Sequence, residues 1–405
     1  MTPLSALAID GVFDRARLAR TAAELEAQVG AGLELGGQLF LALQGEVVAD
    51  AGFGAARPGE PMRRDHLMLW MSSTKPVAAV AICQLWERGR LELDDPVALH
   101  IPEFAQGGKE RVTVRHLLTH TGGLRMVDTG WPAAGWEGVI ARVCAQRREP
   151  RWEPGRKAGY HLASSWFILG ELVRRLDGRR FESYAREEIF EPLGARDCWI
   201  GMPAQRWREY GARMAPMFDV VASAEEGAEK AAGEAPRAAA SPPPVPVENG
   251  ATAEARLVVP SPGGNGCGPI RELARFYQML LAGGALAGRR LLRRETVEAL
   301  AARHRVGLID ATFRARLDWG LGVIVNSAHY GEPEMPYGYG PFAGPRTFGH
   351  SGARSSTAFA DPDAGLVVAL AVNGMPADEV HRQRFERLMA ALYRDLGLAR
   401  ESEAG

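Results

Sequence analysis

The 405-residue chain has few cysteines and no long apolar run. Its four cysteines are widely spaced and match no metal-binding or redox motif: Cys83, Cys144, Cys198 and Cys267. No apolar segment approaches the ~20 residues that a helix needs to cross a bilayer. The sequence thus gives no sign of a cysteine-based metal centre or of a membrane-spanning helix, and we expect neither cofactor nor metal.

The chain also lacks an excess of either charge, since 48 lysines and arginines balance 49 aspartates and glutamates. A net charge of −1 leaves no electrostatic footprint for nucleic acid or for an acidic membrane surface. The first residues, Met1–Asp10, lack the basic start and the apolar stretch of a signal peptide. We therefore expect a cytoplasmic protein whose partner is a small molecule. Nothing in the composition indicates an oligomeric state.

Strand patterns occur at both ends of the chain, which predicts one antiparallel sheet assembled from the two ends. After an amphipathic helix over residues 14–29, residues 37–43 and 46–50 are typical of a hairpin. Four strands and a last helix are predicted further on, at 320–325, 346–349, 355–360, 366–372 and 377–396. The expected fold class is α+β, with an α/β domain made of residues 1–85 and 306–405.

Helical patterns dominate between these ends, and we expect residues 86–305 to form a mainly helical inserted domain. Residues 223–249 are rich in Ala, Glu and Pro and have no periodicity, which is typical of a flexible surface excursion. Within the inserted domain, helices are predicted at 114–119 with Thr113 as N-cap, at 164–176 and at 272–282.

The stretch Ser72-Ser73-Thr74-Lys75 carries the strongest chemical signal. An apolar helical pattern follows it and ends at Gly89. If Ser72 opens that helix, Lys75 lies one turn further on, with Cβ atoms roughly 5–6 Å apart. The amine can then activate the Ser72 hydroxyl, which alone is a poor nucleophile. The structural alternative is that Ser72 is only an N-cap.

Tyr160 is a second candidate, because it closely precedes a predicted helix and follows two glycines, Gly155 and Gly159. A positive charge such as a lysine ammonium lowers the pKa of a nearby phenol. Tyr160 can then act as a base toward Ser72 and later as the acid for the leaving group. The structural alternative is a half-buried tyrosine with a locally bonded hydroxyl.

The segment Gly349-His350-Ser351-Gly352-Ala353 lies between two predicted strands. Its glycines let the backbone approach a ligand closely. A backbone N–H on this edge and the Ser72 N–H can together form an oxyanion hole, in which one donor contributes about 2.7–4 kcal/mol to transition-state stabilisation. An edge strand with a surface histidine is the structural alternative.

Ser-x-x-Lys, then a tyrosine before a helix, then His-x-Gly on a strand, in that order, resemble the motifs of serine β-lactamases and penicillin-binding-protein-like hydrolases. The resemblance covers about residues 35–395 and is closest to class C β-lactamase-like proteins, including the family VIII carboxylesterases. It implies a β-lactamase-like fold: an antiparallel sheet flanked by helices, an all-helical domain, and an active site between them. Supporting segments are similar as well: Leu91–Pro96, Thr113–Leu124, Trp152–Gly155 and Ala358–Pro362.

The resemblance also implies a role for each matching residue. Ser72 is the acylated nucleophile, Lys75 polarises it, and Tyr160 acts as base and then protonates the leaving group. His350 takes the place of the third-motif lysine, and the N–H groups of Ser72 and Ala353 form the oxyanion hole. Whether Lys75 or Tyr160 is the formal base stays open.

Two departures from the family pattern bear on the substrate. Leu162 stands where class C β-lactamases carry an Asn that contacts the acylamino group of the substrate. His350 stands where they carry a lysine near the β-lactam carboxylate, and an unperturbed histidine is largely neutral at pH 7. Both departures favour esters over β-lactams, although Arg354 or Arg125 can restore a cation.

We therefore predict a serine hydrolase that works through an acyl-enzyme, a carboxylesterase for short-chain esters. The alternatives on this scaffold are hydrolysis of a β-lactam or D-amino-acid amide, acyl transfer to an alcohol, and binding without catalysis. A different fold also competes, because Gly349-His350-Ser351-Gly352-Ala353 nearly matches the nucleophile elbow of α/β-hydrolases. That elbow requires a strand before Ser351 and a helix after it.

Overall fold

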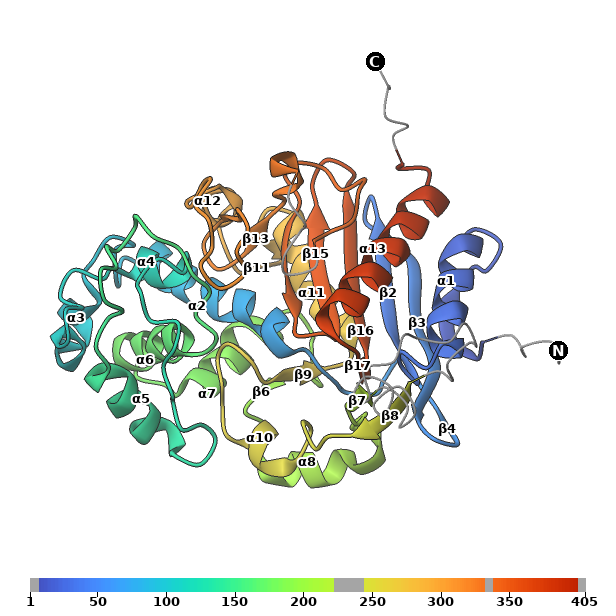
Figure 1. The fold of residues 1–405 in the computed structure, drawn as a ribbon, viewed down its shortest axis with the longest axis horizontal. Coiled ribbons are helices and arrows are strands. Elements are labelled where there is room, and N and C mark those ends of the chain that lie inside the picture. Colours follow the sequence, from blue (N-terminus) through green and yellow to red (C-terminus); the bar gives the residue numbers. More distant parts are fainter. Residues whose placement is uncertain (1–6, 222–243, 332–337, 400–405) are drawn as a thin grey trace, which may run out of the picture.

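A nine-stranded antiparallel sheet runs through the residues that the computed structural model describes, which are 7–221, 244–331 and 338–399 (Figure 1). The strand order is β1-β3-β2-β16-β15-β14-β13-β12, and β4 pairs with β3. The strands are Ile9–Phe13 (β1), Gly36–Leu43 (β2), Glu46–Arg57 (β3), Glu60–Pro61 (β4), Asp318–Trp319 (β12), Ile324–Val325 (β13), Phe348–Gly352 (β14), Ser356–Asp361 (β15) and Leu366–Val372 (β16). The two chain ends meet where β2 pairs with β16, which confirms the predicted α+β sheet.

Strand β16 is apolar along its whole length because both faces of the sheet are covered. Alternate residues such as Val367 and Ala369 belong to the same core as α2 (Lys75–Glu87) and α11 (Ile270–Leu281). The residues between them, such as Val368 and Leu370, pack in a second core with α1 (Ala19–Gly30) and α13 (Asp378–Asp395). The sheet is therefore the middle layer of the molecule (Figure 1).

The helices between Val97 and Ala185, α3 to α7, gather at the end of the molecule away from α1 and α13 (Figure 1). Thr113 caps α4 as predicted: its hydroxyl accepts the His116 N–H, and the His116 ring accepts the Thr113 N–H. The domain limits at residues 86 and 305 remain a prediction. The further helices are Val97–His100 (α3), Val114–Leu118 (α4), Gly135–Ala145 (α5), Ser164–Asp177 (α6), Phe181–Ala185 (α7), Ala204–Tyr210 (α8), Glu254–Val258 (α10) and Arg294–Ala301 (α12), with short 3₁₀ or π turns at Met71–Thr74 (η1), Pro102–Ala105 (η2), Arg186–Phe190 (η3), Gly211–Arg213 (η4) and Ala328–Tyr330 (η5).

Three small sheets complete the described fold. They are β5 (Met68–Leu69), β9 (Gly266–Gly268) and β6 (Trp199–Ile200); β17 (Gly374–Met375), β7 (Phe218–Val221) and β8 (Val245–Glu248); and β10 (Ala285–Leu286) with β11 (Arg289–Arg290). Of the predicted excursion at 223–249, residues 223–243 lie outside the described residues. Its last part contains strand β8, which the sequence did not predict.

Several predicted boundaries were wrong for local reasons. The first helix starts at residue 19, because the Asp14 carboxylate accepts the N–H groups of Ala16 and Arg17 and forms a turn there. The strand predicted at 320–325 shrinks to 324–325. Gly322 has φ +75°, and a Cβ on it would lie 2.4 Å from Ala79 Cβ, so this stretch is a glycine turn against α2. The strand predicted at 346–349 lies at 348–352.

Candidate active site

The turn that carries Ser72 joins β5 to α2. Residues 71–74 form a 3₁₀ turn and α2 begins only at Lys75, so Ser72 does not open the α-helix. Met71 has φ +50°, a left-handed backbone that a side chain disfavours. Ser72 is partly exposed, whereas Ser73, Thr74 and Lys75 are buried. The turn thus presents one hydroxyl to solvent and buries the residues after it.

Hydrogen bonds fix this turn against the sheet. Ser73 Oγ donates to the His350 carbonyl at 3.0 Å and lies 3.0 Å from Ser356 Oγ. Ser356 Oγ in turn donates to the Trp70 carbonyl at 2.7 Å. On the other side, Thr74 Oγ1 accepts the Gly266 N–H at 2.8 Å. The short side chains of Ser73 and Ser356 allow the turn to pack closely against β14 and β15.

Lys75 lies against Ser72, as the spacing predicted. Its Nζ is 2.9 Å from Ser72 Oγ and donates to the Gly263 carbonyl at 2.8 Å. The side chain is fully buried, and burial holds the pKa of Lys75 well below its ordinary value of 10.5. The low pKa favours the neutral amine, whose lone pair can take a proton from Ser72.

Tyr160 lies beside this pair. Lys75 Nζ is 5.0 Å from the centre of the Tyr160 ring, and the tyrosine is only 7% exposed. The Tyr160 N–H donates to Asp310 Oδ1 at 3.1 Å, and Asp310 pairs with Arg305 at 3.0 Å in a buried ion pair. That ion pair fixes the backbone of Tyr160 and therefore the place of its ring. Sequence reasoning missed both Asp310 and Arg305.

A group of buried histidines surrounds Tyr160. The His120 ring lies 4.7 Å from the Tyr160 ring and the His350 ring 6.1 Å from it. Burial, together with the nearby Lys75, lowers the pKa of His350 to about 3. Burial likewise lowers the pKa of His161 to about 3. His350 is therefore neutral at pH 7, and it lies in the interior and not at an open surface.

The end of β14 meets the turn of residues 71–74, which we call the nucleophile turn because it carries the predicted nucleophile Ser72, without space for a side chain. A Cβ on Gly352 would lie 2.2 Å from the Trp70 carbonyl oxygen and 2.2 Å from Ser356 Oγ. Ala353 follows and is exposed. Within the described structure, no backbone carbonyl of another element accepts the N–H of Ser72 or of Ala353. That these two N–H groups form an oxyanion hole beside Ser72 stays a prediction.

Leu162 is 68% exposed. Its neighbour His161 is buried and accepts the Leu124 N–H at 3.1 Å, which anchors the loop. Arg125, named above as a replacement cation, is paired through several contacts with Glu149. The Arg354 guanidinium lies 3.9 Å from Asp219 and from Asp378 and donates to the Met375 and Pro376 carbonyls at 3.5 and 3.3 Å.

Gly263 is a further functional residue that the sequence did not single out. Its carbonyl accepts a hydrogen bond from Lys75, and a Cβ on it would lie 2.7 Å from the Trp166 ring. Four glycines occur between residues 263 and 268, and this density is a signal of close backbone approach that sequence reasoning can use.

Ser351 does not occupy a nucleophile elbow. It lies inside β14, is buried, and its Oγ donates to Thr357 Oγ1 on β15 at 3.1 Å. A strand follows it where the α/β-hydrolase interpretation requires a helix. That interpretation is therefore wrong.

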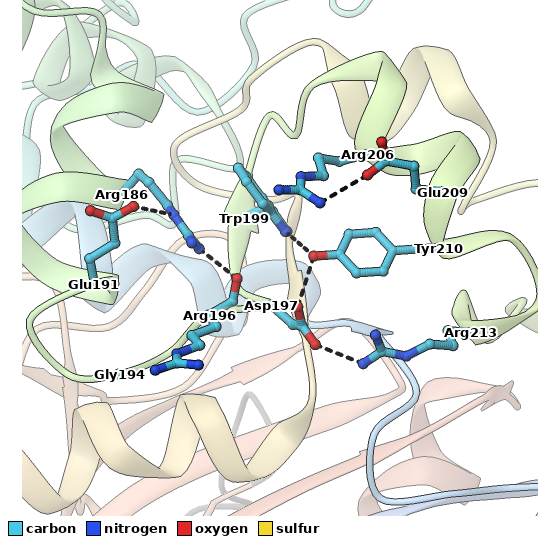
Figure 2. Close-up of a pocket in the computed structure, with 10 residues that line it drawn as sticks. All are labelled: Arg186, Glu191, Gly194, Arg196, Asp197, Trp199, Arg206, Glu209, Tyr210 and Arg213. Carbon is cyan, nitrogen blue, oxygen red and sulfur yellow. Dashed lines mark hydrogen bonds and ion pairs between the residues drawn. The ribbon is translucent and has the colours of Figure 1, made fainter.

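Figure 2 shows a polar pocket of about 680 Å³ that contains none of the residues described above. Three of its arginines are paired with carboxylates: Arg186 with Glu191, Arg206 with Glu209 and Arg213 with Asp197. Its lining includes no serine, cysteine or lysine. We assign it no part in the chemistry.

Two searches of the described residues were negative. They contain no group of three or more His, Cys, Asp or Glu side chains that could hold a metal ion. Among the same residues, no helix is long and apolar enough to cross a membrane.

A family model described as Beta-lactamase matches residues 22–392, and the chain belongs to the beta-lactamase family of serine hydrolases. Esterase/beta-lactamase LipL of Mycobacterium tuberculosis (strain ATCC 25618 / H37Rv) is 30% identical over 353 residues, which are 84% of this chain and 77% of LipL. A solved family VIII carboxylesterase is 30% identical, with a TM-score of 0.75 and coverage of 96% of this chain and 100% of that one. A penicillin-binding-protein homologue from Caulobacter crescentus is 33% identical, with the same TM-score and coverage.

Proposed function

We propose that this serine hydrolase cleaves short-chain carboxylic esters through an acyl-enzyme on Ser72. The observation that carries the proposal is the buried Lys75 amine, 2.9 Å from Ser72 Oγ and with a pKa lowered by burial. A neutral amine at this distance has a free lone pair, so it can accept the Ser72 proton and act as a general base.

The reaction has two half-steps. As Ser72 Oγ bonds to the ester carbonyl carbon, Lys75 takes the hydroxyl proton. The N–H groups of Ser72 and Ala353 donate to the resulting oxyanion. The carbon–oxygen bond to the alcohol then breaks, and Tyr160 passes a proton to the leaving alkoxide while the lysine proton restores the phenol. Water then attacks the acyl carbon with the same proton transfers. The bond from this carbon to Ser72 Oγ breaks, and the acid and the free Ser72 hydroxyl are released.

This scheme makes Lys75 the base in acylation and Tyr160 the proton carrier. The sequence predicted that Lys75 lowers the pKa of Tyr160, and this effect exists only while the Lys75 amine is charged. Burial of Lys75 disfavours that charge in the resting enzyme. The lysine becomes charged when it accepts the Ser72 proton, so a positive charge lies 5.0 Å from the Tyr160 ring at the moment when the leaving group needs a proton.

The charge and polarity near the site support an ester over a β-lactam. His350 is neutral with a pKa of about 3, and the Arg125 guanidinium is engaged by Glu149. Leu162 presents an exposed apolar side chain where an amide would bind the acylamino group. The solved family VIII carboxylesterase agrees with this choice, whereas the name of LipL covers both esters and β-lactams.

The first experiment compares wild type, Ser72→Ala and Ser351→Ala on p-nitrophenyl esters of increasing chain length and on nitrocefin. We expect an initial burst and a mass increase on Ser72 with p-nitrophenyl acetate or butyrate, because the acyl-enzyme accumulates. Ser72→Ala is expected to lose hydrolysis, and Ser351→Ala, altered at a buried serine, to keep it. Nitrocefin turnover without ester turnover would contradict the proposed substrate class. Ester hydrolysis by Ser72→Ala would contradict the proposed nucleophile.

Leu162→Asn tests the substrate preference directly. We expect the ratio of nitrocefin to ester kcat/KM to rise about 2–10-fold, the value of one added hydrogen bond. Leu99→Asn is the matched control, since Leu99 on α3 is 65% exposed against 68% for Leu162. We expect Leu99→Asn to leave the ratio unchanged. An equal shift in both variants would remove Leu162 from substrate recognition.

The proposed location is cytoplasmic. Its support is that all four cysteines are buried free thiols, which suits a reducing compartment.

A further inference from the structure

We propose that Arg384 is a positioning residue for the oxyanion hole and acts through the backbone of Arg354. The proposal rests on the function proposed above and deepens it. Arg384 belongs to α13, on the face of the sheet opposite α2, and is fully buried. It is therefore separated from the substrate and has no direct part in the chemistry.

One nitrogen of Arg384 joins two segments beside the site. Nη2 donates to the Arg354 carbonyl at 2.9 Å and to the Gly374 carbonyl at 2.8 Å. Arg354 directly follows Ala353, whose N–H is one of the two proposed oxyanion donors. This nitrogen thus fastens the turn after β14 to β17 at shorter distances than the 3.5 Å bond from Arg354 to the Met375 carbonyl.

This turn needs an external restraint. Arg354 has φ +50°, a strained conformation for a residue with a side chain. The other contacts of Arg354 in the described structure are longer, between 3.3 and 3.9 Å. The hairpin bonds of the flanking residues, from Ser355 N–H to the Gly352 carbonyl at 3.4 Å and from Val372 N–H to the Ser355 carbonyl at 2.8 Å, do not hold the Arg354 carbonyl itself, so loss of the Arg384 bond lets this peptide group shift. Such a change displaces the neighbouring Ala353 N–H from the nucleophile.

The rest of the guanidinium is fixed on its far side. Nη1 donates to the Leu33 carbonyl at 3.0 Å and to Glu34 Oε2 at 2.5 Å, and the His381 ring accepts from Nε at 3.2 Å. The Arg384–Glu34 pair is fully buried. Because replacing a buried ion pair by apolar residues is often neutral or stabilising, stability alone is a weak explanation for this one. Its geometry instead ties residues 33–34, 354 and 374 to α13.

The test is Arg384→Met, read out by kinetics and by the affinity of phenylboronic acid. The boron adduct of Ser72 is tetrahedral and places an oxygen in the oxyanion hole. We expect kcat for p-nitrophenyl butyrate to fall about 10–100-fold, below the 10²–10³ expected for complete loss of a donor. KM is expected to stay within about threefold, and boronate affinity to weaken by about the same factor as kcat/KM, as for an interaction made only in the transition state.

Two further variants keep the test decisive if Arg384→Met folds poorly. Arg384→Lys keeps the positive charge and one donor nitrogen and is expected to lose less kcat than Arg384→Met. Glu34→Gln leaves the Nη2 bonds in place and is expected to lose less than either. Arg179→Met, which removes surface ion pairs to Asp177, Glu187 and Glu188, is the control and is expected to change neither kcat nor boronate affinity.

The outcomes separate the two proposals. A folded Arg384→Met enzyme with unchanged kcat and boronate affinity overturns the positioning role while the esterase proposal stands. Loss of folded protein in all Arg384 and Glu34 variants, with normal kcat per folded molecule, also overturns it. A wild-type enzyme that neither hydrolyses esters nor binds phenylboronic acid contradicts the proposed function itself.

Discussion

Lys75→Met is expected to lower kcat/KM for p-nitrophenyl butyrate about 10²–10⁴-fold, the usual contribution of a positioned general base. Methionine fills a similar volume but has no lone pair of comparable basicity, so Ser72 keeps its place and loses its base. The measurement is steady-state kinetics with active-site titration of the remaining acylation. A loss of less than tenfold would transfer the base role to Tyr160.

The same change is expected to raise stability. Burial lowers the folded-state pKa of Lys75 below its unfolded value of 10.5, so between these two values the unfolded chain binds more protons. In wild type, Lys75 therefore makes stability rise with pH across that window. We expect the stability gain of Lys75→Met to be larger at pH 7 than at pH 9.5 in urea unfolding.

Lys109 is the matched control for this prediction. It is also fully buried, and its ammonium donates to the carbonyls of Gln106 and Cys144 in the helical part of the molecule. Lys109 also donates to the Gln146 carbonyl, so Lys109→Met leaves three carbonyls without their donor, whereas Lys75→Met leaves only that of Gly263. We therefore expect Lys109→Met to have lower stability with unchanged kcat per folded molecule. Loss of kcat in both variants would show that any buried lysine is needed for folding of the site.

Gly352→Ala is expected to lower kcat about 10²-fold, because a methyl group has no room where β14 meets the nucleophile turn. The added Cβ would overlap the Trp70 carbonyl oxygen and Ser356 Oγ, each at 2.2 Å. Both partners are fixed by the Ser356–Trp70 hydrogen bond, so strand and turn must separate. This separation moves the Ala353 N–H away from Ser72, so the proposed oxyanion hole loses one of its two donors. Overpacking also lowers stability, by about 1–3 kcal/mol.

Gly30→Ala is the control for Gly352→Ala. Gly30 ends α1, and a Cβ on it meets no atom within 4 Å. We expect unchanged kcat and a small gain in stability of about 0.4–1 kcal/mol, because alanine restricts the unfolded chain. Kinetics and thermal unfolding of both variants, measured together, check the pair. Unchanged kcat in a folded Gly352→Ala enzyme would contradict the oxyanion assignment.

Local signals in the sequence were enough for much of the fold. The apolar run 366–372 matches β16 residue for residue, because a strand covered on both faces needs no polar alternation. Thr113 was predicted as a cap because its side chain serves the backbone only three residues ahead. The spacing of Ser72 and Lys75 likewise predicted their contact, although through a 3₁₀ turn.

The remaining site residues depend on contacts between distant parts of the chain. Asp310 supports Tyr160 from 150 positions away, and the Gly263 carbonyl meets Lys75 from 188 positions away. Arg384 reaches Glu34 across 350 positions. No periodicity or propensity encodes such pairings, because they follow from how the sheet and helices pack. The wrong ends of the strands at 320–325 and 346–349 arise in the same way, from glycines that meet α2 and the nucleophile turn.

The pairing of β2 with β16 has a consequence for synthesis of the protein. β2 ends at Leu43, and its partner strand begins at Leu366, so the sheet stays open at its centre until most of the chain has left the ribosome. Ser72 emerges early, whereas Ala353 and β16 emerge late. A nascent or C-terminally truncated chain therefore carries the proposed nucleophile without the Ala353 N–H, its second proposed oxyanion donor. Ester hydrolysis is therefore expected only after β16 has paired with β2, so the activity can serve as a measure of chain completion.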